Sequence, residues 1–282
     1  MRILVTGATG FVGQHVVSKL IAHHHDVVAV ARNLNRAKKM PWFDEVKFIA
    51  CDLHVLKLDP SKTFGIPDAL VHLAWPGLPN YKDKFHLEEN LPADCDFLKS
   101  MILAGTKHVL VTGTCLEYGM QEGALSEEAE PMPTTPYGIA KDQLREFLEE
   151  LQAQHPFILQ WARLFYMYGP GQNKNSLLAQ LDHAIDNHDE VFNMSGGEQQ
   201  RDYLPVEDVA HNITLLLEHP ECSGIINCCS GKPITVRQLV EERIAKSGAK
   251  IKLNLGKYPY PDYEPMSFWG DNTKLKRISD EK

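Results

Sequence analysis

Long apolar runs and an excess of positive charge are both missing from this sequence. Its 282 residues contain 29 Lys and Arg against 37 Asp and Glu, which gives a formal net charge of −8. Nucleic-acid binding depends on a basic surface, so this balance argues against a nucleic-acid partner. The apolar run at residues 1–6 is too short for the core of a signal peptide, and no stretch is long enough to span a membrane. We therefore expect a soluble cytoplasmic protein that binds no membrane.

Cysteine is scarce, and the six cysteines show neither a C-x-x-C pair nor the spacing of a disulfide framework. They predict reduced thiols in a cytosolic protein. A metal site is not expected either. The run His23, His24 and His25 falls at a helix end, where consecutive side chains cannot all face one ion, so it predicts a solvated loop.

Short β-branched runs alternate with helical patterns through the first two thirds of the chain. The predicted strands are residues 3–5, 27–31, 46–50, 69–73, 108–111 and 157–161, and the predicted helices are residues 12–23, 85–104 and 138–154. Such alternation implies right-handed β-α-β crossovers and a parallel sheet covered on both faces. The sequence therefore predicts an α/β fold with a Rossmann-type doubly wound sheet.

The alternation weakens after about residue 165. Helical stretches at residues 176–187, 206–219 and 236–247 are separated by loops rich in Gly and Pro. We expect residues 1–165 to form the nucleotide-binding domain. Residues 166–282 are expected to form mainly a smaller substrate-binding region, with some segments returning to the sheet. The acidic, proline-rich segment 121–136 is predicted to be a surface loop beside the site.

A glycine-rich loop, Thr6-Gly7-Ala8-Thr9-Gly10-Phe11-Val12-Gly13, joins the first strand to the first helix. Gly7 permits the tight turn, Gly10 lets the backbone approach a pyrophosphate, and Gly13 allows close packing of helix on strand. The helix N-terminus then offers N–H groups to the phosphates, so Thr9, Phe11 and Val12 are also expected to contact the cofactor. This arrangement predicts a dinucleotide site.

The end of the second strand indicates which dinucleotide binds. NAD-binding proteins usually carry a carboxylate there that accepts from the ribose 2′-OH. This chain has Arg32 and Asn33 instead, followed by Arg36. Cations suit a 2′-phosphate, which favours NADP(H). A solvated, basic helix start is the alternative explanation.

Further cofactor contacts are expected where the next strands end. Asp52 and Leu53 close the third strand, where the carboxylate can accept from the adenine amino group, although Asp52 could equally be a helix N-cap. Residues near the ends of the later strands are also expected beside the cofactor: Leu73, Ala74, Trp75, Thr112 and Leu164.

The motif Tyr137-Gly-Ile-Ala-Lys141 indicates catalysis. Residues at i and i+4 share one face of a helix, so the ammonium can approach the phenol and lower its pKa toward neutrality. Thr114, after an upstream strand, can supply a hydroxyl to the same substrate oxygen. We expect Thr114, Tyr137 and Lys141 to be the catalytic residues.

Together these pieces resemble the extended short-chain dehydrogenase/reductase family, the NAD-dependent epimerase/dehydratase group, over essentially the whole chain. Other matching segments are His72-Leu-Ala, Asn90, Thr112–Gly119, Arg163 with Tyr168-Gly-Pro-Gly, Arg201-Asp-Tyr-Leu-Pro-Val-Glu-Asp-Val-Ala and Trp269-Gly-Asp. The resemblance implies that Tyr137 is the acid/base, that Thr114 binds the carbonyl oxygen, and that Lys141 binds the nicotinamide ribose.

The resemblance also implies a nucleotide-diphosphate-sugar substrate and a homodimer. Arg201 is similar to the arginine that grips the diphosphate, while a structural ion pair with Asp202 or Asp208 is the alternative. The other residues expected at the substrate are Trp75, Thr114, Cys115 and Tyr166. The chain departs from the family at Tyr166, where an Asn is frequent, and it has no second arginine before Trp269.

The residues after Thr114 narrow the reaction. Family dehydratases carry an Asp-Glu pair there, whereas this chain has Cys115 and Leu116, which argues against dehydration. The position of Cys115 does not match the cysteine of C3/C5 epimerases, and a buried apolar thiol is expected. The closest type is an NADPH-dependent reductase of nucleotide-linked 4-keto-6-deoxysugars, such as dTDP-4-keto-6-deoxyglucose, in the biosynthesis of surface polysaccharides. A nucleotide-sugar C4 epimerase and a non-catalytic NADP(H)-sensing protein are the alternatives.

Overall fold

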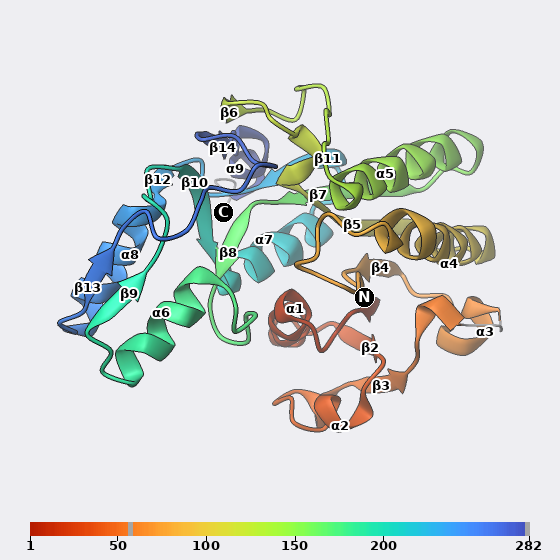
Figure 1. Cartoon of the computed structure of the whole chain (residues 1–282). Coiled ribbons are helices and arrows are strands. Elements are labelled where there is room, and N and C mark those ends of the chain that lie inside the picture. Colours follow the sequence, from red (N-terminus) through yellow and green to blue (C-terminus); the bar gives the residue numbers. More distant parts are fainter. Residues whose placement is uncertain (56–58, 280–282) are drawn as a thin grey trace.

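A seven-stranded parallel sheet forms the centre of the molecule in the computed structural model, which describes residues 1–55 and 59–279. The strand order is β11-β7-β5-β4-β1-β2-β3 (Figure 1). Their bounds are β1 Arg2–Thr6, β2 Asp26–Ala31, β3 Lys47–Ala50, β4 Ala69–His72, β5 His108–Thr114, β7 Ile158–Leu164 and β11 Gly224–Cys228. The six predicted strands are confirmed, with ends shifted by up to three residues. β11 was not predicted, because it is a short run beyond the alternating part of the chain.

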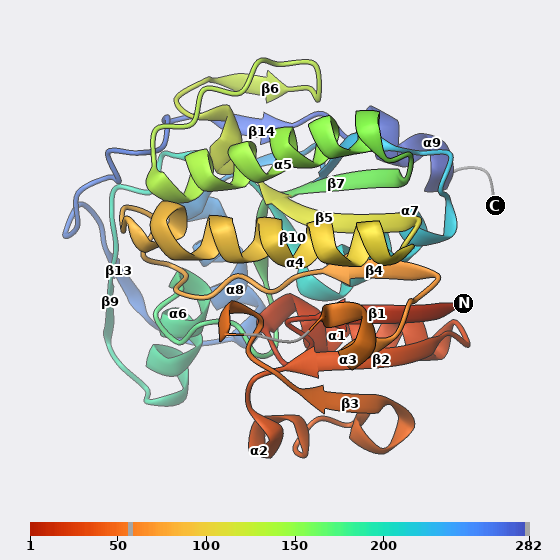
Figure 2. The same ribbon diagram turned by 90° about the vertical axis from the view of Figure 1, so that its right-hand side faces the viewer.

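Helices cover both faces of this sheet, as the sequence predicts for a doubly wound fold. One face carries α1 (Phe11–Ala22), α7 (Val206–Glu218) and α9 (Thr273–Ser279), and the other carries α3 (Pro60–Phe64), α4 (Leu91–Ala104) and α5 (Pro136–Gln154). Figure 2 shows α4 and α5 lying in front of the strands. Successive side chains of β1 point to opposite faces of the sheet and pack into the apolar core on each face. Ile3 and Val5 pack with α1, and Leu4 packs with α4.

The predicted helix 85–104 is divided in two. A π-helical turn, η3 (His86–Asn90), comes before α4, and Pro92 lies in the first turn of α4. Proline has no N–H to donate to the preceding turn, so a regular α-helix cannot run through this position unchanged.

Among the described residues, no helix has both the length and the apolar character needed to cross a bilayer.

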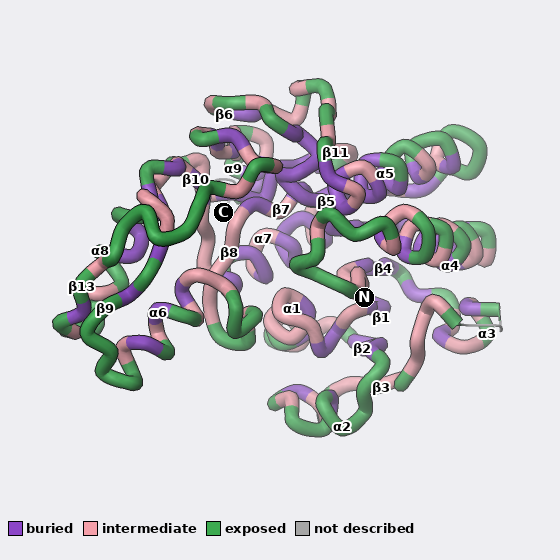
Figure 3. Tube along the Cα trace, in the orientation of Figure 1, coloured by how far each residue is buried: buried purple, intermediate pink, exposed green. Residues whose placement is uncertain are grey.

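The C-terminal third adds a smaller layered unit beside the carboxyl ends of the strands. Its helices α6 (Leu177–Asp186) and α8 (Val236–Ser247) pack around their own apolar cluster, which includes Leu181 and Val240. Its strands are β8 Tyr166–Tyr168, β9 Val191–Asn193, β10 Gln200–Pro205, β12 Pro233–Thr235, β13 Lys252–Asn254 and β14 Phe268–Gly270. Burial is densest along the central strands (Figure 3).

The segment 121–136, predicted to be a loop, contains strand β6 (Gly123–Leu125), which pairs in parallel with β14. Pairing with a partner far along the chain leaves no local signal, so a sequence pattern cannot reveal this strand. The remaining short helices are α2 Leu34–Ala37, η1 Phe43–Glu45, η2 Leu53–Val55 and η4 Cys115–Tyr118.

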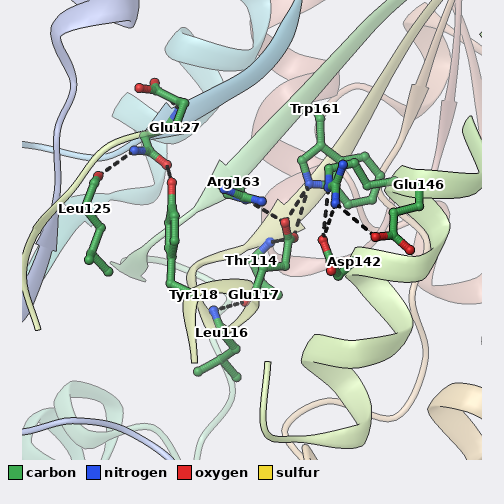
Figure 4. Close-up of polar contacts among 12 residues, drawn as sticks. Thr114, Leu116, Glu117, Tyr118, Leu125, Glu127, Asp142, Glu146, Trp161 and Arg163 are labelled. Atoms are coloured by element: carbon green, nitrogen blue, oxygen red, sulfur yellow. Dashed lines mark hydrogen bonds and ion pairs between the residues drawn. The ribbon is translucent and has the colours of Figure 1, made fainter. Parts of the chain in front are cut away.

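A buried ion pair joins the carboxyl ends of β5 and β7. The Glu117 carboxylate accepts from Arg163 Nε at 2.6 Å, from Trp161 Nε1 at 3.0 Å and from the Thr114 N–H at 2.7 Å (Figure 4). Both charged side chains are 0% exposed. A Cβ on Gly113 would lie 2.2 Å from Trp161 Nε1, so only glycine leaves room for this cluster. The cluster therefore fixes the backbone that presents Thr114.

Glu117→Gln should destabilise the fold strongly, because it leaves the Arg163 guanidinium buried without a counter-charge. Removing one partner of a buried pair costs about 3–5 kcal/mol. Urea denaturation should show the free energy of unfolding falling by that amount.

Glu241→Gln is the matched control, since the Arg237–Glu241 pair on α8 has the same 2.7 Å separation but is about half exposed. Its loss should cost less than about 1 kcal/mol. A Glu117→Gln protein no less stable than this control would contradict the role given to the buried pair.

Candidate active site

The expected site residues gather at one edge of the parallel sheet. Gly7 follows β1, Ala74 follows β4 and Thr114 ends β5. Neighbouring parallel strands end at the same edge, which is where α/β sheets bind ligands. The sheet order puts β4 between β1 and β5, so the glycine-rich loop and Thr114 lie on either side of the β4 end.

The glycine-rich loop lies tightly against the end of β4. Gly7 has φ +66°, and a Cβ there would lie 2.8 Å from Ala74 N; a Cβ on Gly13 would lie 2.2 Å from Gly7 O. Gly10 is the N-cap of α1 and provides no side-chain cap. The N–H groups of the first helical turn, at Phe11 and Val12, have no acceptor within a helix. This loop therefore fits a pyrophosphate, as the sequence predicts, and Thr9 beside it is buried.

The ends of β2 and β3 carry the residues expected at the adenosine half. Asn33 is the N-cap of α2, where its side chain accepts from the Arg36 N–H at 2.9 Å. Arg32 and Arg36 are exposed, and neither guanidinium forms an ion pair with another described residue. Asp52 Oδ1 accepts from the His54 N–H at 3.1 Å at the start of η2, so the capping alternative for Asp52 is the one seen.

Tyr137 and Lys141 lie one turn apart on α5, and both are buried. The Thr135 side chain caps this helix and Pro136 opens it, which fixes Tyr137 in its first turn. The Lys141 Nζ lies 3.9 Å from the centroid of the Trp75 ring, in cation–π contact. Burial lowers the pKa of Lys141 to about 8, against the opposing charges of Asp94 and Glu117.

The expected lowering of the Tyr137 pKa is wrong for this arrangement. Burial raises the pKa of the phenol well above its ordinary value, and the nearby Tyr81 and Glu117 raise it further. A hydrogen bond with the Thr114 side chain acts in the opposite direction. The phenol is therefore protonated at neutral pH, the state that a proton donor requires.

Thr114 and its neighbours complete this side of the site. The Thr114 Oγ1 accepts from the Leu116 N–H at 3.3 Å, which leaves its own hydrogen for another acceptor. Thr112 donates to the carbonyl oxygen of His72 at 3.4 Å. Leu164, on β7, lies opposite Thr114 in the strand register. Cys115 is buried, and burial raises the pKa of its thiol, consistent with an apolar role.

Arg201 pairs with a residue that the sequence did not single out. Its Nη2 donates to Glu264 Oε2 at 3.0 Å, and its Nη1 donates to the carbonyl oxygens of Gln200 and Met266. The alternative ion pair with Asp202 or Asp208 is not found: Arg201 pairs with Glu264, and Asp202 accepts from the backbone N–H groups of Ser230 and Gly231.

Aromatic rings enclose this region. Arg201 lies 5.7 Å from the Tyr166 ring, on the side expected to bind substrate. Tyr81 was missed by the sequence analysis, yet its ring centroid lies 5.5 Å from that of Tyr137 and 5.8 Å from that of Tyr263. His86 was also missed, at 5.2 Å from Tyr137. No short motif marks either residue, since both reach Tyr137 only through the fold.

The histidine run does not form a solvated loop as predicted. His23 Nδ1 and His25 Nε2 both contact Glu218 Oε1, at 2.9 and 3.1 Å, and tie the end of α1 to α7, while His24 is exposed. Within residues 1–55 and 59–279, no group of three or more His, Cys, Asp or Glu is placed to hold a metal ion.

Known proteins are similar to this chain in sequence and in architecture. The chain is 33% identical over 273 residues to the dTDP-6-deoxy-L-talose 4-dehydrogenase (NAD(+)) of Aggregatibacter actinomycetemcomitans, covering 96% of this chain and 99% of that protein. It is 27% identical over 260 residues to the GDP-6-deoxy-D-mannose reductase of Pseudomonas aeruginosa, covering 85% and 78%.

Among solved structures, MoeE5 in complex with UDP-glucuronic acid and NAD matches with a TM-score of 0.83 and 25% identity, over 99% of this chain and 92% of that one. The model of the NAD dependent epimerase/dehydratase family matches residues 3–229, which include the glycine-rich loop, Thr114, Tyr137 and Lys141. This chain therefore belongs to the NAD-dependent epimerase/dehydratase family.

Proposed function

We propose that this protein reduces the C4 keto group of a nucleotide-linked 6-deoxyhexose with NADPH. The observation that carries the proposal is the hydrogen bond between Thr114 and the buried phenol of Tyr137, at the sheet edge that also carries the glycine-rich loop. The relative from Aggregatibacter supports the choice of substrate, because its name describes the oxidation at C4 of a dTDP-linked 6-deoxysugar. Reduction of the 4-keto sugar is the reverse of that reaction.

Tyr137, Thr114 and Lys141 would each have a separate role in such a reduction. The nicotinamide cofactor supplies the hydride. Tyr137 donates the proton to the sugar oxygen, and Thr114 donates a hydrogen bond to the charge that develops there. The ammonium of Lys141 stabilises the phenolate that Tyr137 leaves behind. Burial of the three side chains strengthens these electrostatic effects, because water does not screen them.

Three other activities are the alternatives to this proposal: dehydration, C4 epimerisation and the sensing of NADP(H) without catalysis. Cys115 and Leu116 provide no acid/base pair for dehydration, and the Glu117 carboxylate already forms an ion pair with Arg163. A C4 epimerase would keep its cofactor through two half-reactions and would leave the amount of reduced cofactor unchanged. A protein that only senses NADP(H) would not need the buried Tyr137–Lys141 pair.

The choice of NADPH rests on the end of β2. Arg32 and Arg36 are exposed there without ion-pair partners among the described residues, and no carboxylate is present to receive a ribose 2′-OH. The name of the Aggregatibacter relative gives NAD(+) as its cofactor, so the two cofactors need a direct comparison.

Arg32→Asp tests this choice. The parent protein should bind NADPH more tightly than NADH, because Arg32 attracts the 2′-phosphate, and the variant should lose or reverse that preference. Fluorescence titration of both cofactors measures the ratio. Lys47→Asp, on the neighbouring β3, controls for the general change of charge. Equal or tighter NADH binding by the parent would exclude the NADPH assignment.

The reductase proposal is tested by following the absorbance of NADPH and of NADH with a panel of nucleotide-linked 4-keto-6-deoxyhexoses. One of them should oxidise the cofactor stoichiometrically, with a 6-deoxyhexose as product. Conversion of a nucleotide-linked sugar into its C4 epimer without net oxidation of cofactor would instead identify an epimerase.

Tyr137→Phe removes only the phenolic hydroxyl, so it should leave the fold and cofactor affinity nearly intact. General acid catalysis contributes about 10²- to 10⁴-fold, and kcat should fall by that order. Thr114→Ala should lose less, because a water molecule can replace its hydrogen bond. Lys141→Met should also weaken cofactor binding. Near-parental activity of Tyr137→Phe on the identified sugar would refute its catalytic role.

A further inference from the structure

The indole ring of Trp75 contacts both members of the Tyr137–Lys141 pair. The Lys141 Nζ lies 3.9 Å from the centroid of this ring, and the Tyr137 ring meets it edge-on, with 5.9 Å between the two centroids. Lys141 is 2% exposed, and no residue of the described chain forms an ion pair or a hydrogen bond with its ammonium. The face of Trp75 is therefore the direct contact that this chain provides for the buried cation.

His86 binds the edge of the same indole. Trp75 Nε1 donates to His86 Nδ1 at 3.0 Å, and the planes of the two rings differ by 18°. An indole N–H can only donate and a carbonyl oxygen can only accept. Nδ1 is therefore an acceptor, and Nε2, which lies 3.0 Å from the carbonyl oxygen of Asn80, carries the hydrogen. These two bonds fix both the tautomer and the orientation of the imidazole.

The surroundings of His86 Nδ1 suit only a neutral ring. The Asn90 amide nitrogen also faces Nδ1, at 3.3 Å, while it donates to the carbonyl oxygen of Pro76 at 3.0 Å. A hydrogen on Nδ1 would meet two other donors, the indole of Trp75 and the amide of Asn90. Protonation of His86 would therefore break its bond to Trp75.

We propose that His86 is a positioning residue, which accepts the indole N–H of Trp75 and thereby holds the face of that ring against the ammonium of Lys141. The proposal rests on the proposed function, which gives Lys141 its role beside the proton donor Tyr137. The indole cannot turn away from the cation without losing its hydrogen bond to His86. The segment after β4 thus positions a side chain of the catalytic helix α5.

His86→Phe removes the acceptor but keeps an aromatic ring. One hydrogen bond is worth about a threefold to tenfold change in an equilibrium, so kcat of the reductase should fall by about that factor. The KM for the sugar should change little, because the contact is made to Lys141. His86→Asn should recover most of the lost kcat, since its amide oxygen can lie where Nδ1 lies.

His108→Phe is the matched control for loss of stability. His108 is also buried, and its Nε2 lies 2.8 Å from Gln160 Oε1, but it begins β5 at the edge of the sheet opposite the site. This variant should destabilise the fold in urea without lowering kcat. A parental kcat in His86→Phe, or an equal fall of kcat in His108→Phe, would overturn the proposal.

The Trp75 indole gives a second readout that needs no sugar. The chain has four Trp residues, and Trp75→Phe identifies the indole N–H signal of Trp75 in nuclear magnetic resonance spectra of the ¹⁵N-labelled protein. This signal should shift as the pH rises through the pKa of Lys141, about 8, where the ammonium loses its charge. It should shift again at acid pH, where His86 is protonated, because burial lowers the pKa of that ring. The other titratable groups that face Lys141 or His86 are Asp83, Asp94, Glu117 and Tyr137.

His86→Phe should lose both shifts, because the imidazole is gone and the indole no longer stays on the ammonium. Lys141→Met should lose only the shift near pH 8, which assigns it. Persistence of that shift in His86→Phe would contradict the positioning role, since a merely structural residue would leave it in place. If His86→Phe does not fold, the parent decides: both shifts support the proposal, and the absence of either refutes it. If no ketosugar is reduced but the shifts behave as stated, the proposed function fails while the role of His86 stands.

Discussion

The carboxylate of Glu117 binds three separate parts of the chain in a place that water does not reach. It receives the Arg163 guanidinium from β7, the indole N–H of Trp161 and the backbone N–H of Thr114. Because a buried charge with one missing partner is expensive, each partner must be in position for the others to be tolerated. The end of β5 is thereby held rigid, and Thr114 reaches Tyr137 from a fixed backbone.

Two further buried or nearly buried pairs, each with one carboxylate, lie at the same edge of the sheet. His72 and Asp94 lie beneath the glycine-rich loop, and Arg201 and Glu264 lie on the side of the C-terminal unit. Such pairs contribute little net stability compared with apolar residues of the same size. These pairs lie at the edge of the sheet where ligands bind, whereas the rest of the sheet is packed with apolar side chains. This distribution fits buried charges that contribute to the chemistry of the site more than to the stability of the fold.

The sequence predicts those parts of the fold and site whose signals are local. Apolar runs predict strands β1 to β5 and β7, and the spacing of its glycines predicts the glycine-rich loop. The separation of Tyr137 and Lys141 by four residues predicts that they lie on one face of a helix. Contacts between distant segments carry no such signal. Glu264 is 63 residues from Arg201, and Tyr81 reaches Tyr137 only because the loop after β4 folds over α5. The direction of the Tyr137 pKa was also beyond a spacing argument, because burial of the phenol and the neighbouring Tyr81 and Glu117 raise it.

The Arg201–Glu264 contact affects the binding affinity that would be measured for a nucleotide at this site. Arg201 already binds an internal carboxylate through Nη2, and its Nη1 donates to two backbone carbonyl oxygens. A diphosphate that bound Nη2 of this guanidinium would compete with Glu264, and the displaced carboxylate would need water or another donor. The binding free energy observed for such a ligand would then be the difference between two anion complexes of one arginine, and it would understate the strength of the ligand's own contact with Arg201.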